Sequence, residues 1–204
     1  RPRWKLRDPR FRKVLRQWVP VVGTASIFTI NQQVAILFAS GLEDGSGSAM
    51  TNALVFWQLP FGIFGAAITT VMFPRMSRQA AARDTEGLSD TLQFGFRYLM
   101  TLLIPSALVL SLLGREIIAV ALQRGAFEAR FTTLTSEVLM YYSLGLLSVG
   151  AYNYFQRFFY ATGDFRTPLF VAGVTLVLDV GLSLWLKETP LRVRGLALAN
   201  SIAF

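Results

Sequence analysis

The sequence predicts an all-α protein that crosses a membrane several times, and three observations lead to this prediction. Of its 204 residues, 53% are apolar and 16% are charged, whereas average soluble proteins carry roughly 25% charged residues. The mean hydropathy is +0.46. The charges are clustered and leave long uncharged windows, of 26 residues over 17–42 and 30 residues over 45–74, for example. A bilayer core of about 30 Å needs about 20 mostly apolar residues in a helix.

The uncharged windows give the expected order of elements. We expect a basic cytoplasmic or interfacial segment over 1–16, followed by a single transmembrane helical bundle over 17–204. An amphipathic stretch over 115–127 is expected to lie at the outer membrane interface. The expected spans are approximately 17–42, 48–74, 93–114, 133–160, 167–186 and 195–204, the last of which is truncated.

The distribution of basic residues predicts the orientation. Eight lysines and arginines lie in the first 16 residues, and the loops on the same side raise the total to 14, against six on the opposite side. Because cytoplasmic loops are enriched in basic residues, the basic N-terminal segment is expected in the cytoplasm. The same asymmetry accounts for the net charge of +8 without a nucleic-acid partner.

The composition also limits the chemistry. The chain has no His and no Cys, which removes imidazole bases, thiolate nucleophiles and the commonest zinc ligands. It has no paired catalytic carboxylates, glycine-rich phosphate loop or nucleophile elbow. We therefore expect no enzymatic activity and no cofactor other than a coupling cation, sodium or a proton.

Polar residues and helix breakers inside the first two spans are candidate site residues. Asn31 and Gln32 lie near the middle of the first span, where amides either hydrogen-bond a neighbouring helix or line a water-filled cavity. In the second span, Pro60 is expected to kink the helix, and Gly62 and Gly65 to allow a neighbour to approach closely. Bent helices at mid-membrane are also a feature of transporters.

Asp179 is the most unusual residue, because it lies about a dozen residues into a span. A carboxylate there costs at least about 2.5 kcal/mol on insertion scales, so it should face protein or water. It is a candidate cation ligand, a proton carrier, half of an ion pair, or an acid hydrogen-bonded to neighbouring helices. Ser183 lies one turn away, and Asn200 on the last helix could supply another oxygen for a hard cation.

Three further residues complete the candidates for a substrate cavity. Arg97 and Arg157 lie near cytoplasmic helix ends, where they either snorkel to the interface or contact an anionic headgroup. Gln58 precedes Pro60 by two residues. Asn31, Gln32, Gln58, Arg97 and Arg157 are thus the predicted cavity residues.

Several stretches resemble, in order, the MurJ (MviN) lipid II flippases of the MOP exporter superfamily. The longest reads Gln-Leu-Pro-Phe-Gly-Ile-Phe-Gly-Ala-Ala-Ile-Thr-Thr-Val-Met-Phe-Pro-Arg-Met-Ser-Arg over 58–78. Others are Arg-Asp-Pro over 7–9, Leu-Gln-Arg-Gly-Ala-Phe over 122–127, Phe-Tyr-Ala-Thr-Gly-Asp-Phe-Arg-Thr-Pro over 159–168 and Gly-Leu-Ala-Leu-Ala-Asn-Ser over 195–201. The resemblance covers nearly the whole chain.

The resemblance implies a fold and a function. Family members have about 14 transmembrane helices in two lobes of a MATE-like arrangement, and this chain is similar to helices seven to eleven and the start of twelve. The resemblance implies a flippase that carries lipid-linked peptidoglycan precursor across the bacterial inner membrane by alternating access, for cell wall synthesis. The implied partners are membrane lipid, a lipid-linked undecaprenyl-pyrophosphate saccharide, the missing N-terminal lobe and other cell-wall synthesis proteins.

The chain departs from the family pattern at two sites. Where members often carry an Asp-Arg pair on the second span, this chain has Leu54 and Val55. At the sodium site that some members have, Ala35 replaces an acid of the first span, Asp179 and Ser183 stand where Asn and Asp are expected, and Asn200 falls near a Thr. These departures leave two other hypotheses beside the flippase. One is an exporter of another lipid-linked saccharide, and the other is a degenerate, non-transporting membrane scaffold in cell-wall assembly.

Overall fold

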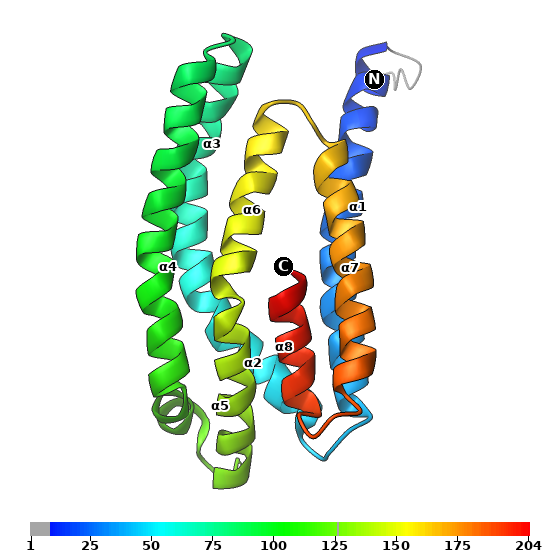
Figure 1. Ribbon diagram of the computed structural model, residues 1–204, viewed down its shortest axis with the longest axis vertical. Coiled ribbons are helices and arrows are strands. Elements are labelled where there is room, and N and C mark those ends of the chain that lie inside the picture. The colour runs from blue at the N-terminus through cyan, green and yellow to red at the C-terminus, as the bar shows by residue number, and fades with distance from the viewer. Residues whose placement is uncertain (1–8, 126) are drawn as a thin grey trace, which may run out of the picture.

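The computed structural model describes residues 9–125 and 127–204, and the regular structure of these residues is entirely helical (Figure 1). Residues 1–8 of the predicted basic segment lie outside the described residues. The helices are α1 (Pro9–Ser40), α2 (Ser46–Pro60), the π-helix η1 (Phe61–Gly65), α3 (Ala66–Ala81), α4 (Thr85–Leu122), α5 (Ala129–Leu144), α6 (Leu146–Ala161), α7 (Arg166–Leu186) and α8 (Val193–Ala203).

Within the described part of the chain, four helical stretches are long and apolar enough to cross a membrane. They are Val14–Ser40, Ser46–Ala81, Thr85–Leu122 and Arg166–Leu186. The predicted class, an all-helical membrane protein, is therefore confirmed. The predicted span over 133–160 is not one helix: it is divided at Gly145 into α5 and α6, each of 16 residues.

The division at Gly145 has a packing cause that the hydropathy pattern does not contain. A Cβ at Gly145 would lie 2.5 Å from Oγ and 2.7 Å from Cα of Ser201 on α8. Ser201 Oγ also donates a hydrogen bond of 2.7 Å to the carbonyl of Tyr141. The absence of a side chain at Gly145 thus lets α8 lie directly against the junction of α5 and α6.

The second span bends where Pro60 predicts a kink. Pro60 has no N–H to donate, and the following five residues, Phe61–Gly65, adopt π-helical hydrogen bonding between α2 and α3. The expected close approach at the two glycines is wrong. A Cβ at Gly62 would meet no atom within 4 Å, and at Gly65 the nearest atom, at 3.3 Å, belongs to the Phe61 ring of the same segment.

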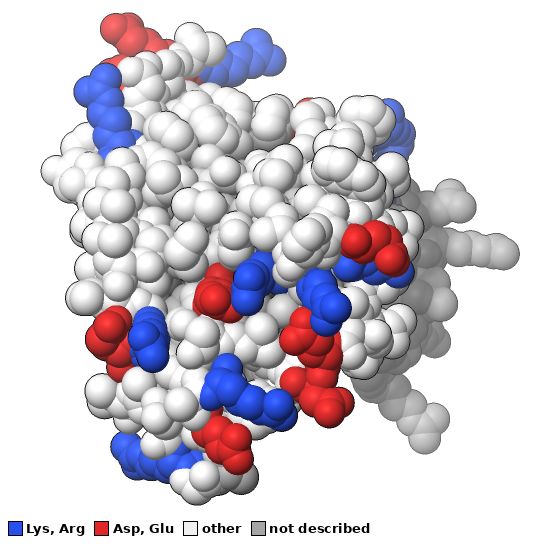
Figure 2. All heavy atoms as spheres, turned by 60° about the horizontal axis from the view of Figure 1, so that its bottom comes forward, with Lys and Arg blue, Asp and Glu red and all other residues white. Residues whose placement is uncertain are grey.

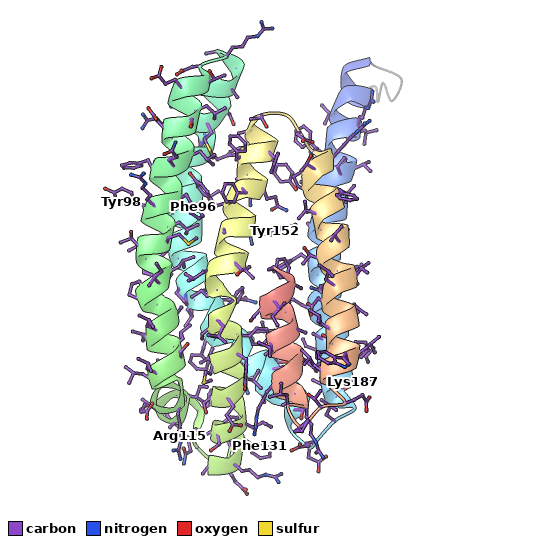
Figure 3. The ribbon with its side chains drawn as sticks, in the orientation of Figure 1. Phe96, Tyr98, Arg115, Phe131, Tyr152 and Lys187 are labelled. Atoms are coloured by element: carbon purple, nitrogen blue, oxygen red, sulfur yellow. The ribbon has the colours of Figure 1, made fainter. Side chains whose placement is uncertain are left out.

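The amphipathic stretch predicted over 115–127 continues α4 as far as Leu122 and does not form a separate helix. In Figure 1 the lowest turns of α4 are seen nearly end-on, turned away from the line of the helix. Arg115 and Phe131 lie at this lower end of the bundle (Figure 3).

The contact between α4 and α6 forms one side of the core. Tyr154 is buried, and its hydroxyl lies 3.3 Å and 3.2 Å from the carbonyl oxygens of Thr91 and Leu92. A Cβ at Gly95 would overlap this hydroxyl, so glycine is needed where α6 crosses α4. Phe96 points from α4 toward α6, with its ring centroid 6.4 Å from that of Tyr154, whereas Tyr98 points away from the bundle (Figure 3).

The two ends of the bundle separate the loops into the two sets that the charge pattern predicts. The α3–α4 and α6–α7 connections lie at the same end as the start of α1, and the α1–α2, α4–α5 and α7–α8 connections lie at the other (Figure 1). At this second end, Arg192 pairs with Glu43 at 2.6 Å and Arg194 with Glu137 at 2.7 Å. Figure 2 shows acidic and basic side chains next to one another across this end.

Candidate functional site

A buried polar cluster joins α1, α7 and α8 in the middle of the bundle. Asn31 Nδ2 and Asn200 Nδ2 both donate to Asp179 Oδ2, at 2.7 Å and 2.8 Å, and Ser183 Oγ lies 3.3 Å from Asp179 Oδ1. We call Asn31, Asp179, Ser183 and Asn200 the carboxylate cluster. The structure thus brings together the three residues predicted as a cation site and adds Asn31 from the first span.

Three members of the carboxylate cluster, Asn31, Asp179 and Ser183, are almost inaccessible to solvent, and Asn200 is partly buried. The exposed fraction is 1% for Asp179 and 4% for Asn31. A buried charged group without hydrogen bonds is strongly unfavourable, and three donors from three helices compensate for the loss of water around this carboxylate. The cluster therefore stabilises the contacts among α1, α7 and α8 whatever further role it has.

The composition of the cluster suits a small hard cation, but its orientation in this structure does not. A carboxylate, a hydroxyl and two amides can together supply four oxygen ligands. Here both amides direct their nitrogens, not their oxygens, at Asp179. Binding a cation would require Asn31 and Asn200 to turn by 180°, and in the arrangement described the carboxylate is satisfied by donors alone.

A very small cavity lies beside the cluster. It has a volume of about 10 Å³ and is lined by Asn31, Gln32 and Asn200, together with the aromatic rings of Trp57 and Tyr142. Such a volume corresponds to about one water molecule. Gln32 thus lies next to the cluster, in a space far too small for a lipid headgroup.

A second, larger polar pocket follows the bend of the second span. Its volume is about 200 Å³, and it is lined by Gly62 and Gly65 of the π-helix and by Asn153, Tyr154 and Arg157 of α6. We call it the bend pocket. The two glycines form part of its wall with backbone alone. Single π-helical turns inside α-helices occur frequently at functional sites, because they change the direction of side chains and free backbone groups.

The remaining predicted cavity residues are not brought together. Gln58 is exposed on α2, and Arg97 is exposed on α4, and neither lines the bend pocket or the small cavity. Val55, which stands where the family resemblance implies an arginine, is 56% exposed. The described residues contain no group of three or more acidic side chains that could hold a metal ion.

Sequence reasoning missed one member of these sites, Asn153, and the partner of another, Asn31. Asn31 was expected to hydrogen-bond another helix or line a cavity and does hydrogen-bond α7, but its partner Asp179 is 148 residues away, and no local pattern identifies such a pair. Asn153 could have been found, because it precedes Arg157 by four residues and so lies on the same face of α6.

The helices, with polar residues buried between them, have the fold of part of a helical membrane transporter. A protein from Pyrococcus furiosus, described as a MOP superfamily transporter, has the same fold over 93% of this chain and 41% of its own, with a TM-score of 0.80 and 16% identity. A solved structure described as "Lipid II flippase MurJ, inward closed conformation" covers 100% of this chain and 42% of its own, with a TM-score of 0.79 and 28% identity.

The family model described as "Lipid II flippase MurJ" matches residues 1–204. The chain therefore belongs to the MurJ lipid II flippase family, whose members are multi-pass proteins of the bacterial inner membrane and are transporters, not enzymes. It is 32% identical over its whole length to a probable lipid II flippase MurJ of Borreliella burgdorferi, and 31% identical over 97% of its length to one of Rhizobium tropici. The chain spans about 40% of the length of these relatives.

Proposed function

We propose that this chain forms one lobe of a lipid II flippase, which moves the lipid-linked peptidoglycan precursor across the bacterial inner membrane by alternating access. The observation that carries the proposal is the family match over the full 204 residues. Three polar features that are found in transporters support it, because the chain has a buried carboxylate, a bent second span and an arginine that lines the bend pocket.

In this proposal the bend pocket belongs to the substrate cavity. Arg157 supplies a cation for a pyrophosphate, Asn153 adds an amide, and the π-helix between Pro60 and Ala66 acts as the hinge. The partners are the lipid-linked undecaprenyl-pyrophosphate saccharide, the first lobe of the transporter and other cell-wall synthesis proteins. The basic N-terminal segment faces the cytoplasm.

The test is complementation of a flippase-depleted bacterium by the full-length protein, together with a measurement of lipid II exposed on the outer membrane face. We expect growth to be restored and lipid II to become accessible to an external modifying enzyme. Stable, membrane-inserted protein that gives neither growth nor lipid II exposure would reject the flippase. Exposure of a different lipid-linked saccharide would favour the exporter alternative.

The second candidate, a non-transporting scaffold in cell-wall assembly, is favoured by two substitutions. Val55 occupies the position of a cavity arginine, and Ala35 that of an acid. For a flippase that lacks only this arginine, Val55→Arg should raise complementation. If the unmodified protein and Val55→Arg both fail while still binding cell-wall synthesis proteins, the scaffold is the better description.

Asp179 is proposed to take part in ion coupling, with sodium or a proton as the coupling ion. Asp179→Asn keeps the shape of the side chain but removes the charge, so ion-dependent transport should be lost while expression and folding are kept. The matched control is Asp44→Asn, at an exposed position in the α1–α2 connection. Transport that still depends on the ion in Asp179→Asn would exclude this role.

A further inference from the structure

A large open pocket lies at the N-terminal end of α1, away from both polar sites already described. Its volume is about 760 Å³. One wall comes from α1, with Arg16, Val19 and Pro20, and the other from the turn between α6 and α7, residues 163–166. Gly163 has a φ of 82°, a conformation that favours glycine, and a Cβ there would meet no atom within 4 Å. We call this space the interface pocket.

Among the described residues that line the interface pocket, Asp164 is the single acid, and its carboxylate is already hydrogen-bonded within the protein. Asp164 accepts hydrogen bonds from the backbone N–H groups of Arg166 and Thr167, at 2.9 Å and 3.1 Å, and from Thr167 Oγ1 at 2.5 Å. These bonds, those from Thr167 first, lower the pKa of Asp164, so it remains ionised at the start of α7.

Arg16 and Arg166 line the interface pocket and are available to a ligand. Among the described residues, neither Arg16 nor Arg166 makes an ion pair, whereas Arg192 and Arg194 at the opposite end of the bundle do. Two guanidinium groups beside one carboxylate that is already hydrogen-bonded give the pocket a positive character. Guanidinium groups bind phosphate oxygens well, because their planar donors match the geometry of the phosphate.

The pocket lies at the depth of lipid headgroups. α7 has 21 residues and is about 31 Å long, close to the thickness of a bilayer core, and Arg166 is its first residue. α1 has 32 residues and a length of about 48 Å, so its start extends beyond the core. On the same helices, at the level of the pocket or within a turn of it, Trp18, Val22 and Phe170 expose apolar side chains to the surroundings of the bundle.

We propose that the interface pocket binds the phosphate headgroup of an anionic phospholipid through Arg16 and Arg166, while the acyl chains lie along the exposed apolar faces of α1 and α7. The charge and the depth of the pocket favour a membrane phospholipid over a soluble anion. The bound lipid would connect α1 to the α6–α7 turn. This proposal does not depend on which molecule the protein transports.

The test is native mass spectrometry of the purified full chain with phosphatidylglycerol and phosphatidylcholine. Wild type should bind phosphatidylglycerol preferentially. Arg16→Gln and Arg166→Gln should each reduce this preference about fivefold, and the double variant about 25-fold, as expected from the attraction of each basic residue to anionic lipid. The matched control is Arg75→Gln with Arg78→Gln, two exposed arginines of α3 outside the pocket, which should change the preference less than about twofold.

Three results would overturn the proposal. Equal losses in the two double variants would mean that only general surface charge attracts the lipid. Displacement of phosphatidylglycerol by millimolar inorganic phosphate would indicate a soluble phosphate site, and complete displacement by an undecaprenyl-pyrophosphate lipid would assign the pocket to the transported substrate. If the glutamine variants do not fold, Arg16→Lys with Arg166→Lys tests the same point, because it should retain most of the preference.

Discussion

The carboxylate cluster and the bend pocket contain similar polar groups in opposite settings. In the cluster, both amide nitrogens and the serine hydroxyl are directed at Asp179, which is 1% exposed. In the bend pocket, Arg157 is exposed and faces a space of about 200 Å³. A polar group whose hydrogen bonds are made within the protein contributes to packing, whereas one that faces a cavity is available to a ligand. The two regions should therefore respond differently to mutation.

The largest effect on stability is expected from breaking the cluster. Asn31→Leu removes one of the two amide donors to Asp179 Oδ2 and so leaves the buried carboxylate less well compensated, which should cost about 1–3 kcal/mol. Thermal unfolding in detergent measures this loss. The matched control is Gln33→Leu, on an exposed position of the same helix, which should stay within about 0.5 kcal/mol. Equal stabilities of the two variants would show that the cluster does not hold α1, α7 and α8 together.

Two glycine-to-alanine substitutions compare a position where the backbone is closely packed with a position where it faces open space. Gly145→Ala places a Cβ against the backbone of Ser201 and should destabilise the protein by about 1–3 kcal/mol. Gly62→Ala points into open space at the bend pocket and should cost nothing, with a gain of up to about 1 kcal/mol from helix propensity. Unfolding curves of the two variants give the comparison, and a larger loss for Gly62→Ala would contradict it.

In contrast to the cluster variant Asn31→Leu, the variant Arg157→Gln should lower transport and leave the stability of the fold unchanged. Because the side chain is exposed and makes no ion pair among the described residues, stability should change by less than about 0.5 kcal/mol. If the bend pocket holds the substrate, transport should fall about tenfold, the loss expected for one charge-assisted hydrogen bond. Arg97→Gln, which is also at an exposed position but outside the pocket, is the control. Equal transport in the two variants would remove the bend pocket from the substrate path.

The smallest effect on stability is expected from the substitution Asp164→Asn. Since hydrogen bonds lower its pKa in the folded protein, its carboxylate stabilises the fold above the ordinary pKa of Asp, about 3.9, and this contribution is lost as the pH falls through the lower folded value. Asp164→Asn should therefore unfold at a slightly lower temperature than wild type at pH 7, and the difference should shrink below about pH 4. A difference that does not change with pH would contradict this origin.

A feature of the fold or of the candidate site could be predicted from the sequence when its physical cause lay within a few residues along the chain. The spans around α1 and α7 followed from uncharged windows, and the bend followed from Pro60, because hydrophobicity and a missing N–H act within a few residues. The break at Gly145 depends on Ser201, and the partner of Asp179 lies on another helix, 148 residues away. The open space at Gly62 was also unpredictable, since a glycine looks the same in sequence whether a neighbour is close or absent.

The π-helical segment has a mechanical consequence. α3 continues from it for 16 residues, about 24 Å, to the short connection with α4. By simple geometry, a change of only about 10° in the direction of the segment would displace the far end of α3 by about 4 Å. A small angular adjustment in the middle of the bundle would thus be amplified at its end, and a spectroscopic label at Arg83 would report it as a change in distance from the start of α7.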